Sequence, residues 1–262
     1  MSLKSLFKTE VRQALAQYSP QHGQEMVTRE ALAPLPVAVQ DYLSSCGYLD
    51  KHRIRNFFVE YDNAQIKLKP DANWMNLSCV QFNAMAPATR IALMQANMYG
   101  LLPFGARDKY QHGQGNMLIK LAGLTISNAR GPKMNQAALV TFLAEAPLLP
   151  GLFFQQHTTW QALGPGQVGA SITDAGITVG GAFQFNSRGE ITSFRTRDRY
   201  YSTDGKSYQN WEWSALLDRY RLLGGFKIPT VVRAVWHMPG GRDYEYFRAS
   251  IKSIKYNLTH WP

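Results

Sequence analysis

The period of the hydrophobic pattern changes near Lys51, and this change most strongly constrains what the chain can fold into. Over Leu3–Tyr18 and Val37–Ser45, apolar residues recur every three or four positions, which predicts amphipathic helices. After Lys51, apolar and polar residues alternate, as in Ile177–Phe185 and Ile228–Met238, which is typical of strands with one buried face. We therefore expect a helical arm over residues 1–50, followed by a β region over residues 51–262.

Short turns separate the candidate strands of the β region. Signals such as His112-Gly-Gln-Gly, Thr203-Asp-Gly and Gly224-Gly225 leave no room for crossover helices, so the sheet should be antiparallel. Several strands are much longer than the roughly five or six residues of a typical strand, which favours one large curved sheet or an incomplete barrel. The candidate strands are Arg53–Leu68, Trp74–Asn83, Thr89–Met98, Phe104–Gln111, Asn116–Leu121, Thr158–Leu163, Val168–Thr173, Ile177–Phe185, Ile191–Tyr201, Gln209–Tyr220, Ile228–Met238 and Tyr244–Tyr256.

Two of these strands are apolar on both faces and need cover on the second side. Met117–Leu121 is apolar on both faces except for Lys120, and Thr89–Met98 has apolar residues on both faces. A helix over about 135–146, capped by Asn135 and ended by Pro147, can supply the cover. The expected fold is mainly β (α+β): a large curved antiparallel sheet or incomplete barrel covered by a helix, with an N-terminal helical arm. No linker or repeat is visible, so we expect a single domain over residues 1–262.

Charge and cysteine content narrow the class of protein. Lys and Arg number 28 against 18 Asp and Glu, and the net charge of +10 favours anionic partners. Lys8 and Glu10 break the first apolar run, so no signal peptide is predicted. Cys46 and Cys79 have no other cysteine or histidine close by in sequence, which favours reduced thiols over a disulfide framework or a zinc site. We expect a cytoplasmic protein with no transmembrane segment, and peripheral association with a membrane as a further option.

The sequence lacks catalytic and metal-binding signatures. Gly164–Gly169 has the glycine spacing of a dinucleotide-binding loop, but the following residues alternate like a strand, so a hairpin turn is favoured. The histidines are never paired at the spacing of metal ligands. We therefore predict no catalytic residue, no metal and no cofactor.

Arg195, Arg197 and Arg199 form the sharpest charge feature. On one strand they share a face, at steps of about 6.6 Å. One interpretation is an anion-binding stripe for phosphate, a lipid headgroup or nucleic acid. The favoured interpretation is a solvent-exposed face on which acids of the next strand, such as Glu212 or Asp218, pair with the arginines.

Lys120 and Glu145 form a second candidate. Lys120 interrupts an apolar strand, and Glu145 lies near the end of the predicted covering helix. If the helix covers the strand, a partly buried structural ion pair is expected, since either charge alone would be costly to bury. A catalytic cluster that also includes Asp108 is the alternative, because buried acids and bases have shifted pKa values.

An apolar group offers a third candidate. Methionine side chains adapt to irregular ligands, so a lipophilic pocket between sheet and helix is one interpretation. An ordinary hydrophobic core is the default alternative. The candidate ligand-binding residues are Met75, Phe82, Met94, Met98 and Phe142.

Several segments resemble a bacterial family known as a domain of unknown function. They are Leu35–Leu43, Arg107–Leu121, Leu143–Ala146, Gly225–Thr230 and Ile251–Tyr256. The order of strands and covering helix is similar to that of the LolA/LolB lipoprotein carriers. That resemblance implies an incomplete barrel that holds acyl chains under a helix.

Three functions are consistent with these features. The favoured one is a non-enzymatic binding protein that holds a lipophilic or amphipathic small molecule, or an anionic lipid, between sheet and helix. The first alternative is binding of an anionic polymer or membrane surface through the arginine stripe, with nucleic acid the less favoured partner. The second is an enzyme of unknown reaction built around Glu145, Lys120 and Asp108.

Overall fold

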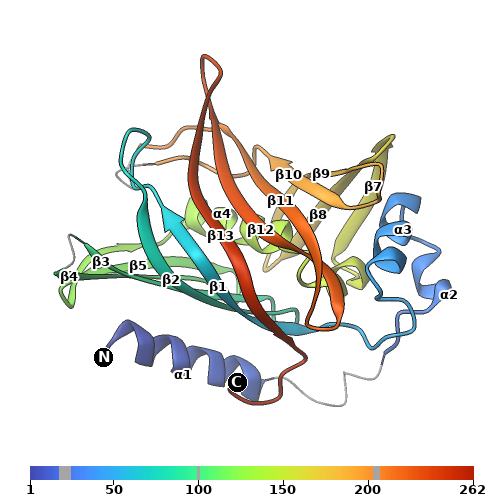
Figure 1. Cartoon of the computed structure of the whole chain (residues 1–262), viewed down its shortest axis with the longest axis horizontal. Coiled ribbons are helices and arrows are strands. Elements are labelled where there is room, and N and C mark those ends of the chain that lie inside the picture. Colours follow the sequence, from blue (N-terminus) through green and yellow to red (C-terminus); the bar gives the residue numbers. More distant parts are fainter. Residues whose placement is uncertain (18–24, 99–100, 203–206) are drawn as a thin grey trace.

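One antiparallel sheet runs through the computed structural model, which describes residues 1–17, 25–98, 101–202 and 207–262 (Figure 1). The turn predicted at Thr203-Asp-Gly lies outside the described residues. The strands are β1 (Asn56–Ile66), β2 (Met75–Ala84), β3 (Thr89–Met98), β4 (Leu102–Gln111), β5 (Gln114–Leu121), β6 (Leu124–Ala129), β7 (Thr158–Gly164), β8 (Gln167–Asp174), β9 (Ile177–Phe185), β10 (Ile191–Thr196), β11 (Glu212–Leu223), β12 (Phe226–Met238) and β13 (Arg242–Tyr256).

The sheet is curved and open. Its strand order is β6-β5-β4-β3-β2-β1-β13-β12-β11-β10-β9-β8-β7, and β1 pairs with β13 at the middle, with Phe57 opposite Tyr256. The edge strands β6 and β7 do not pair with each other in the described sheet. Register shifts, such as that between Glu60 and Tyr61, bend individual strands. The predicted fold, a large antiparallel sheet or incomplete barrel, is therefore confirmed.

Helices lie on both sides of the sheet. They are α1 (Leu3–Ala16), α2 (Arg29–Leu32), α3 (Val37–Ser45), α4 (Pro132–Ala144) and a 3-10 helix, η2 (Pro150–Phe154). The Thr28 side chain caps α2 by accepting a hydrogen bond from the backbone N–H of Ala31. None of the described helices combines the length and the apolar character that a membrane crossing requires.

The covering helix α4 begins three residues before the position that we expected. Pro132 occupies its first turn, and Asn135 does not cap it: the Asn135 side chain instead accepts a hydrogen bond from the Gly115 backbone N–H at 2.9 Å. A Cβ on Gly115 would collide with the backbone carbonyl of Met134. Glycine at this position therefore lets α4 approach β5 closely.

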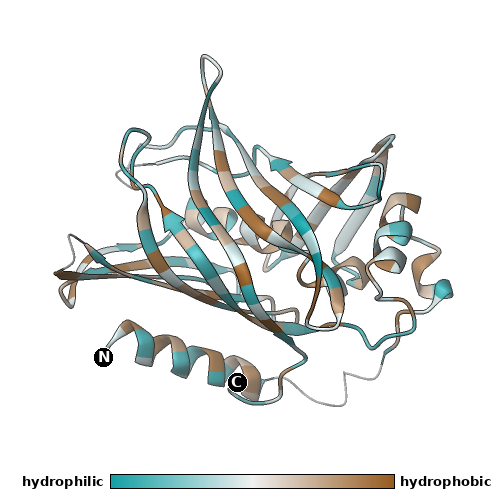
Figure 2. Ribbon diagram, in the orientation of Figure 1, coloured by the Kyte–Doolittle hydropathy of each residue, from teal (hydrophilic) through white to brown (hydrophobic). Residues whose placement is uncertain are grey.

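The doubly apolar strands receive their cover from two helices. α4 packs on the concave face against β4, β5, β8 and β9. The amphipathic helix α1 lies on the opposite, convex face against β3 and β4. Its apolar side, which includes Phe7 and Val11, packs with Phe82, Ile91 and Leu93. Figure 2 shows hydrophilic and hydrophobic stretches alternating along α1. The sequence pattern predicted the need for cover, but we assigned all of it to the later helix.

Candidate functional site

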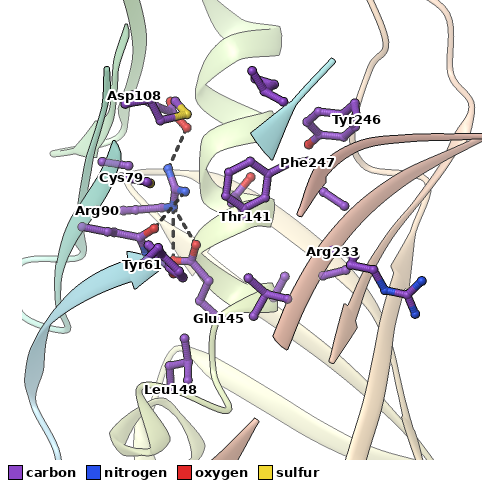
Figure 3. Close-up of a pocket in the computed structure, with 18 of the residues that line it drawn as sticks. Tyr61, Cys79, Arg90, Asp108, Thr141, Glu145, Leu148, Arg233, Tyr246 and Phe247 are labelled. Carbon is purple, nitrogen blue, oxygen red and sulfur yellow. Dashed lines mark hydrogen bonds and ion pairs between the residues drawn. The ribbon is translucent and has the colours of Figure 1, made fainter. Parts of the chain in front are cut away.

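A cavity of about 160 Å³ lies between α4 and the concave face of the sheet (Figure 3). Both halves of the curved sheet contribute to it. Each strand supplies alternate residues, because these point to the same face. Ala92 and Met94 come from β3, and Trp213, Ala215 and Leu217 come from β11. The lining is mostly apolar, and its charged groups are a cluster around Glu145, a separate arginine, Arg199, and Arg233, which pairs with Glu245 at 3.4 Å.

Glu145, which follows the last residue of α4, is the centre of a polar network in one wall. Its carboxylate accepts hydrogen bonds from Arg90 Nε at 2.9 Å, Gln81 Nε2 at 2.8 Å and Asn83 Nδ2 at 2.6 Å. Arg90 Nη1 also pairs with Asp108 Oδ2 at 2.6 Å. These partners lie on β2, β3 and β4, so the network ties the end of α4 to the sheet.

The network is buried, with one cation between two carboxylates. Arg90 is 8% exposed. Burial alone would lower the pKa of Arg90, but Glu145 and Asp108 outweigh it and raise the pKa above its ordinary value. Burial also raises the pKa of the neighbouring Cys79 thiol to about 12 and that of Tyr61 well above its usual range. Arg90 is therefore charged, whereas Cys79 and Tyr61 are neutral.

Arg199 provides a positive charge elsewhere in the cavity wall. Its Nη1 donates a hydrogen bond to Thr141 Oγ1 on α4 at 2.5 Å, and its guanidinium lies 4.6 Å from the ring centroid of Trp213. No carboxylate in the described part of the chain forms an ion pair with Arg199. Contact with an aromatic face stabilises a cation without neutralising it, so Arg199 can attract an anionic group into the cavity.

The expected Lys120–Glu145 ion pair is wrong. Lys120 Nζ donates to the Met1 backbone carbonyl at 3.3 Å, near α1 on the convex side, whereas Glu145 lies on the concave side with Arg90. The two charges are therefore on opposite faces of the sheet. The catalytic alternative loses its base for the same reason, because Lys120 does not approach Glu145 or Asp108.

The predicted apolar site residues are scattered. Met94 lines the cavity. Phe82 is fully buried on the convex face beneath α1, and Phe142 is fully buried in the main core. Met75 packs in an adjoining apolar cluster on the concave side, and Met98 is half-buried at the far end of β3. These four do not line the cavity.

The arginine stripe is divided between two environments. The predicted strand over Ile191–Tyr201 is too long: β10 ends at Thr196, so Arg197 and Arg199 lie outside it. Arg195 is on an exposed surface and pairs with Glu212 of β11 at 2.9 Å, as the solvent-face interpretation expected. Arg197 is also exposed, but Arg199 lines the cavity.

The polar wall was missed at the sequence level. Gln81, Asn83 and Arg90 occupy alternate, inward-facing positions on buried strands, and this placement of polar groups among apolar ones was the available signal. Buried polar groups require hydrogen-bond partners, and these three side chains bond to one another and to Glu145. Within the described residues, no cluster of three His, Cys, Asp or Glu side chains is arranged to hold a metal.

Comparisons with known proteins concern the family and the fold. No curated protein matches the chain. A LolA superfamily protein from Nitrosomonas europaea is 12% identical, with a TM-score of 0.44 over 80% of this chain and 88% of that one. A β-barrel-like protein of the domain of unknown function DUF1849 from Brucella abortus is 8% identical, with a TM-score of 0.33 over 79% and 99% of the two chains. A family model matches residues 25–249, and the chain therefore belongs to the family of unknown function DUF6544.

Proposed function

We propose that the protein binds a lipophilic or amphipathic small molecule with an anionic end in the cavity beneath α4, without catalysing a reaction. The observation that carries this proposal is a cavity with a mostly apolar lining and a cation, Arg199, that no described carboxylate neutralises. Apolar pockets with a few placed polar groups are typical of small-molecule sites.

The size of the cavity limits which part of a ligand it can enclose. Its volume of about 160 Å³ is close to that of an engineered apolar cavity, about 150 Å³, that binds benzene. One ring or a short hydrocarbon segment therefore fits inside. A longer molecule would extend along the concave face, where Met75 and Ala96 pack beside the cavity-lining residues Ile66 and Phe247.

A cavity-filling variant tests the location. Ala215→Phe places a ring in the cavity wall, and Ala162→Phe makes the same change on the exposed surface of β7 as a control. We expect Ala215→Phe to weaken binding of a fluorescent long-chain fatty acid at least tenfold, while the control binds like the unmodified protein. Thermal midpoints verify that both variants fold. Equal binding by both variants would place the ligand elsewhere.

A charge variant tests the anionic end. Arg199→Gln keeps a hydrogen-bond donor near Thr141 but removes the charge. We expect it to weaken binding of the fatty acid and to leave binding of the matched fatty alcohol unchanged. A similar loss for both ligands would mean that Arg199 shapes the cavity and does not recognise a charge.

A further inference from the structure

One end of the sheet exposes large apolar side chains. Leu101, just before β4, and Leu102, its first residue, are 85% and 43% exposed. Leu124 and Ile126 on β6 are 74% and 58% exposed. We call these four residues the leucine end. Single exposed apolar residues are ordinary, but clustered ones indicate an interaction site.

Strand register brings these residues together. Phe104 of β4 is opposite Leu121 of β5, which is opposite Leu124 of β6. The turn between β5 and β6 is joined to β4 by a hydrogen bond from the Ala122 N–H to the Pro103 carbonyl at 2.7 Å. The β4 start and the β5–β6 turn therefore lie at the same end of the sheet.

The beginning of α1 lies at this end too. Leu3 packs over Gly105 of β4, and Lys120 contacts the Met1 carbonyl. Figure 1 shows the start of α1 on the same side of the molecule as the β3–β4 end of the sheet. Lys120, opposite Thr125 of β6, is therefore next to the leucine end. Lys4 follows Leu3 in the first turn of α1 and lines a groove with Gln95 of β3.

The surrounding charge is predominantly positive, although Glu60 of β1 lines the same groove as Lys4. Residues 72–144 contain a single acidic residue, Asp108, whose carboxylate pairs with Arg90 on the concave side. Glu10 of α1 pairs with Arg107 and Lys109. Among the described residues, no carboxylate forms an ion pair with Lys4 or Lys120, so the flank of the leucine end is basic.

We propose that the leucine end docks on an anionic phospholipid bilayer. Exposed leucines and isoleucines insert at the boundary between headgroups and acyl chains, while flanking lysines are attracted to anionic lipids. Charge complementarity selects this occupant over a second copy of the chain, because two copies joined here would bring basic flanks together. This surface is separate from the cavity and does not depend on the proposed ligand.

Vesicle sedimentation tests the proposal with two lipid compositions. We expect the protein to pellet with vesicles of 70% phosphatidylcholine and 30% phosphatidylserine, and much less with pure phosphatidylcholine. Binding should fall as salt rises, because salt screens the attraction. Equal binding to the two compositions, or none to either, would overturn the proposal.

Matched variants locate the contact. Leu101→Ser/Leu124→Ser should weaken vesicle binding at least tenfold, and Lys4→Gln/Lys120→Gln should weaken it about 25-fold, at roughly fivefold for each lysine. Leu163→Ser/Leu222→Ser removes leucines that are 54% and 78% exposed at other turns and should change nothing. An equal loss in this control would overturn the assignment. Analytical ultracentrifugation tests the alternative of self-association. If the protein forms a concentration-dependent dimer that Leu101→Ser/Leu124→Ser abolishes, and does not bind vesicles, the proposal is overturned.

Discussion

Replacing Arg90 with methionine should destabilise the protein far more than the same change at an exposed arginine. Arg90→Met retains much of the side-chain volume but leaves Glu145 and Asp108 without their shared cation. Breaking a buried ion pair from one side costs about 3–5 kcal/mol. For a protein of 262 residues this corresponds to a fall of about 6–10 °C in the midpoint of thermal unfolding.

Arg195→Met is the matched control, because it also removes an arginine from an Arg–Glu pair. The Arg195 side chain is 54% exposed, against 10% for Arg90, and exposed pairs contribute about 0–1 kcal/mol. Urea unfolding of the three proteins gives the two differences in free energy. A loss no larger than that of Arg195→Met would refute the buried-network argument.

Three further outcomes are expected. Gly115→Ala should lower the midpoint of thermal unfolding, because the added Cβ forces α4 away from β5. Gly164→Ala places its Cβ in open space and should leave the midpoint unchanged. Differential scanning calorimetry of both variants measures the two midpoints. Burial would raise the pKa of Glu190, but hydrogen bonds from three side chains lower it to about 2. Glu190→Gln should therefore be less stable than the unmodified protein at neutral pH, and this difference should disappear as the pH falls towards 2. Because burial raises the pKa of Cys79 to about 12, its thiol should react with a disulfide reagent at pH 8 only after unfolding, and fast labelling of the folded protein would contradict this.

The sequence was sufficient for the elements whose residues are buried on one side. Val37–Ser45 and Ile177–Phe185 have the predicted boundaries, because burial on one face imposes a clear period. β6 was missed because its residues are largely exposed, which removes the alternation. The 3-10 helix η2 was missed as well, in a stretch too short to show a helical period.

The site was harder to predict than the fold, because a site requires knowledge of which face each strand presents. The positions of Lys120 and Glu145 in the sequence are compatible with an ion pair between them. Hydrophobic periodicity does not reveal that β5 directs Lys120 away from α4. The Arg199 environment depends on β10 ending at Thr196, after which the side chains no longer alternate regularly. Partner choice among Gln81, Arg90 and Glu145 likewise depends on strand register.

The pairing of β1 with β13 has a consequence for synthesis. Phe57 and Tyr256 face each other although they are 199 positions apart in the sequence. Local hairpins on either side of this seam can form while the ribosome is still elongating the chain, but the seam itself must wait until the last strand emerges. Contacts between such distant residues slow folding, so joining the two hairpin arrays should be the late step, and an unjoined β1 would meanwhile offer a free edge to other chains.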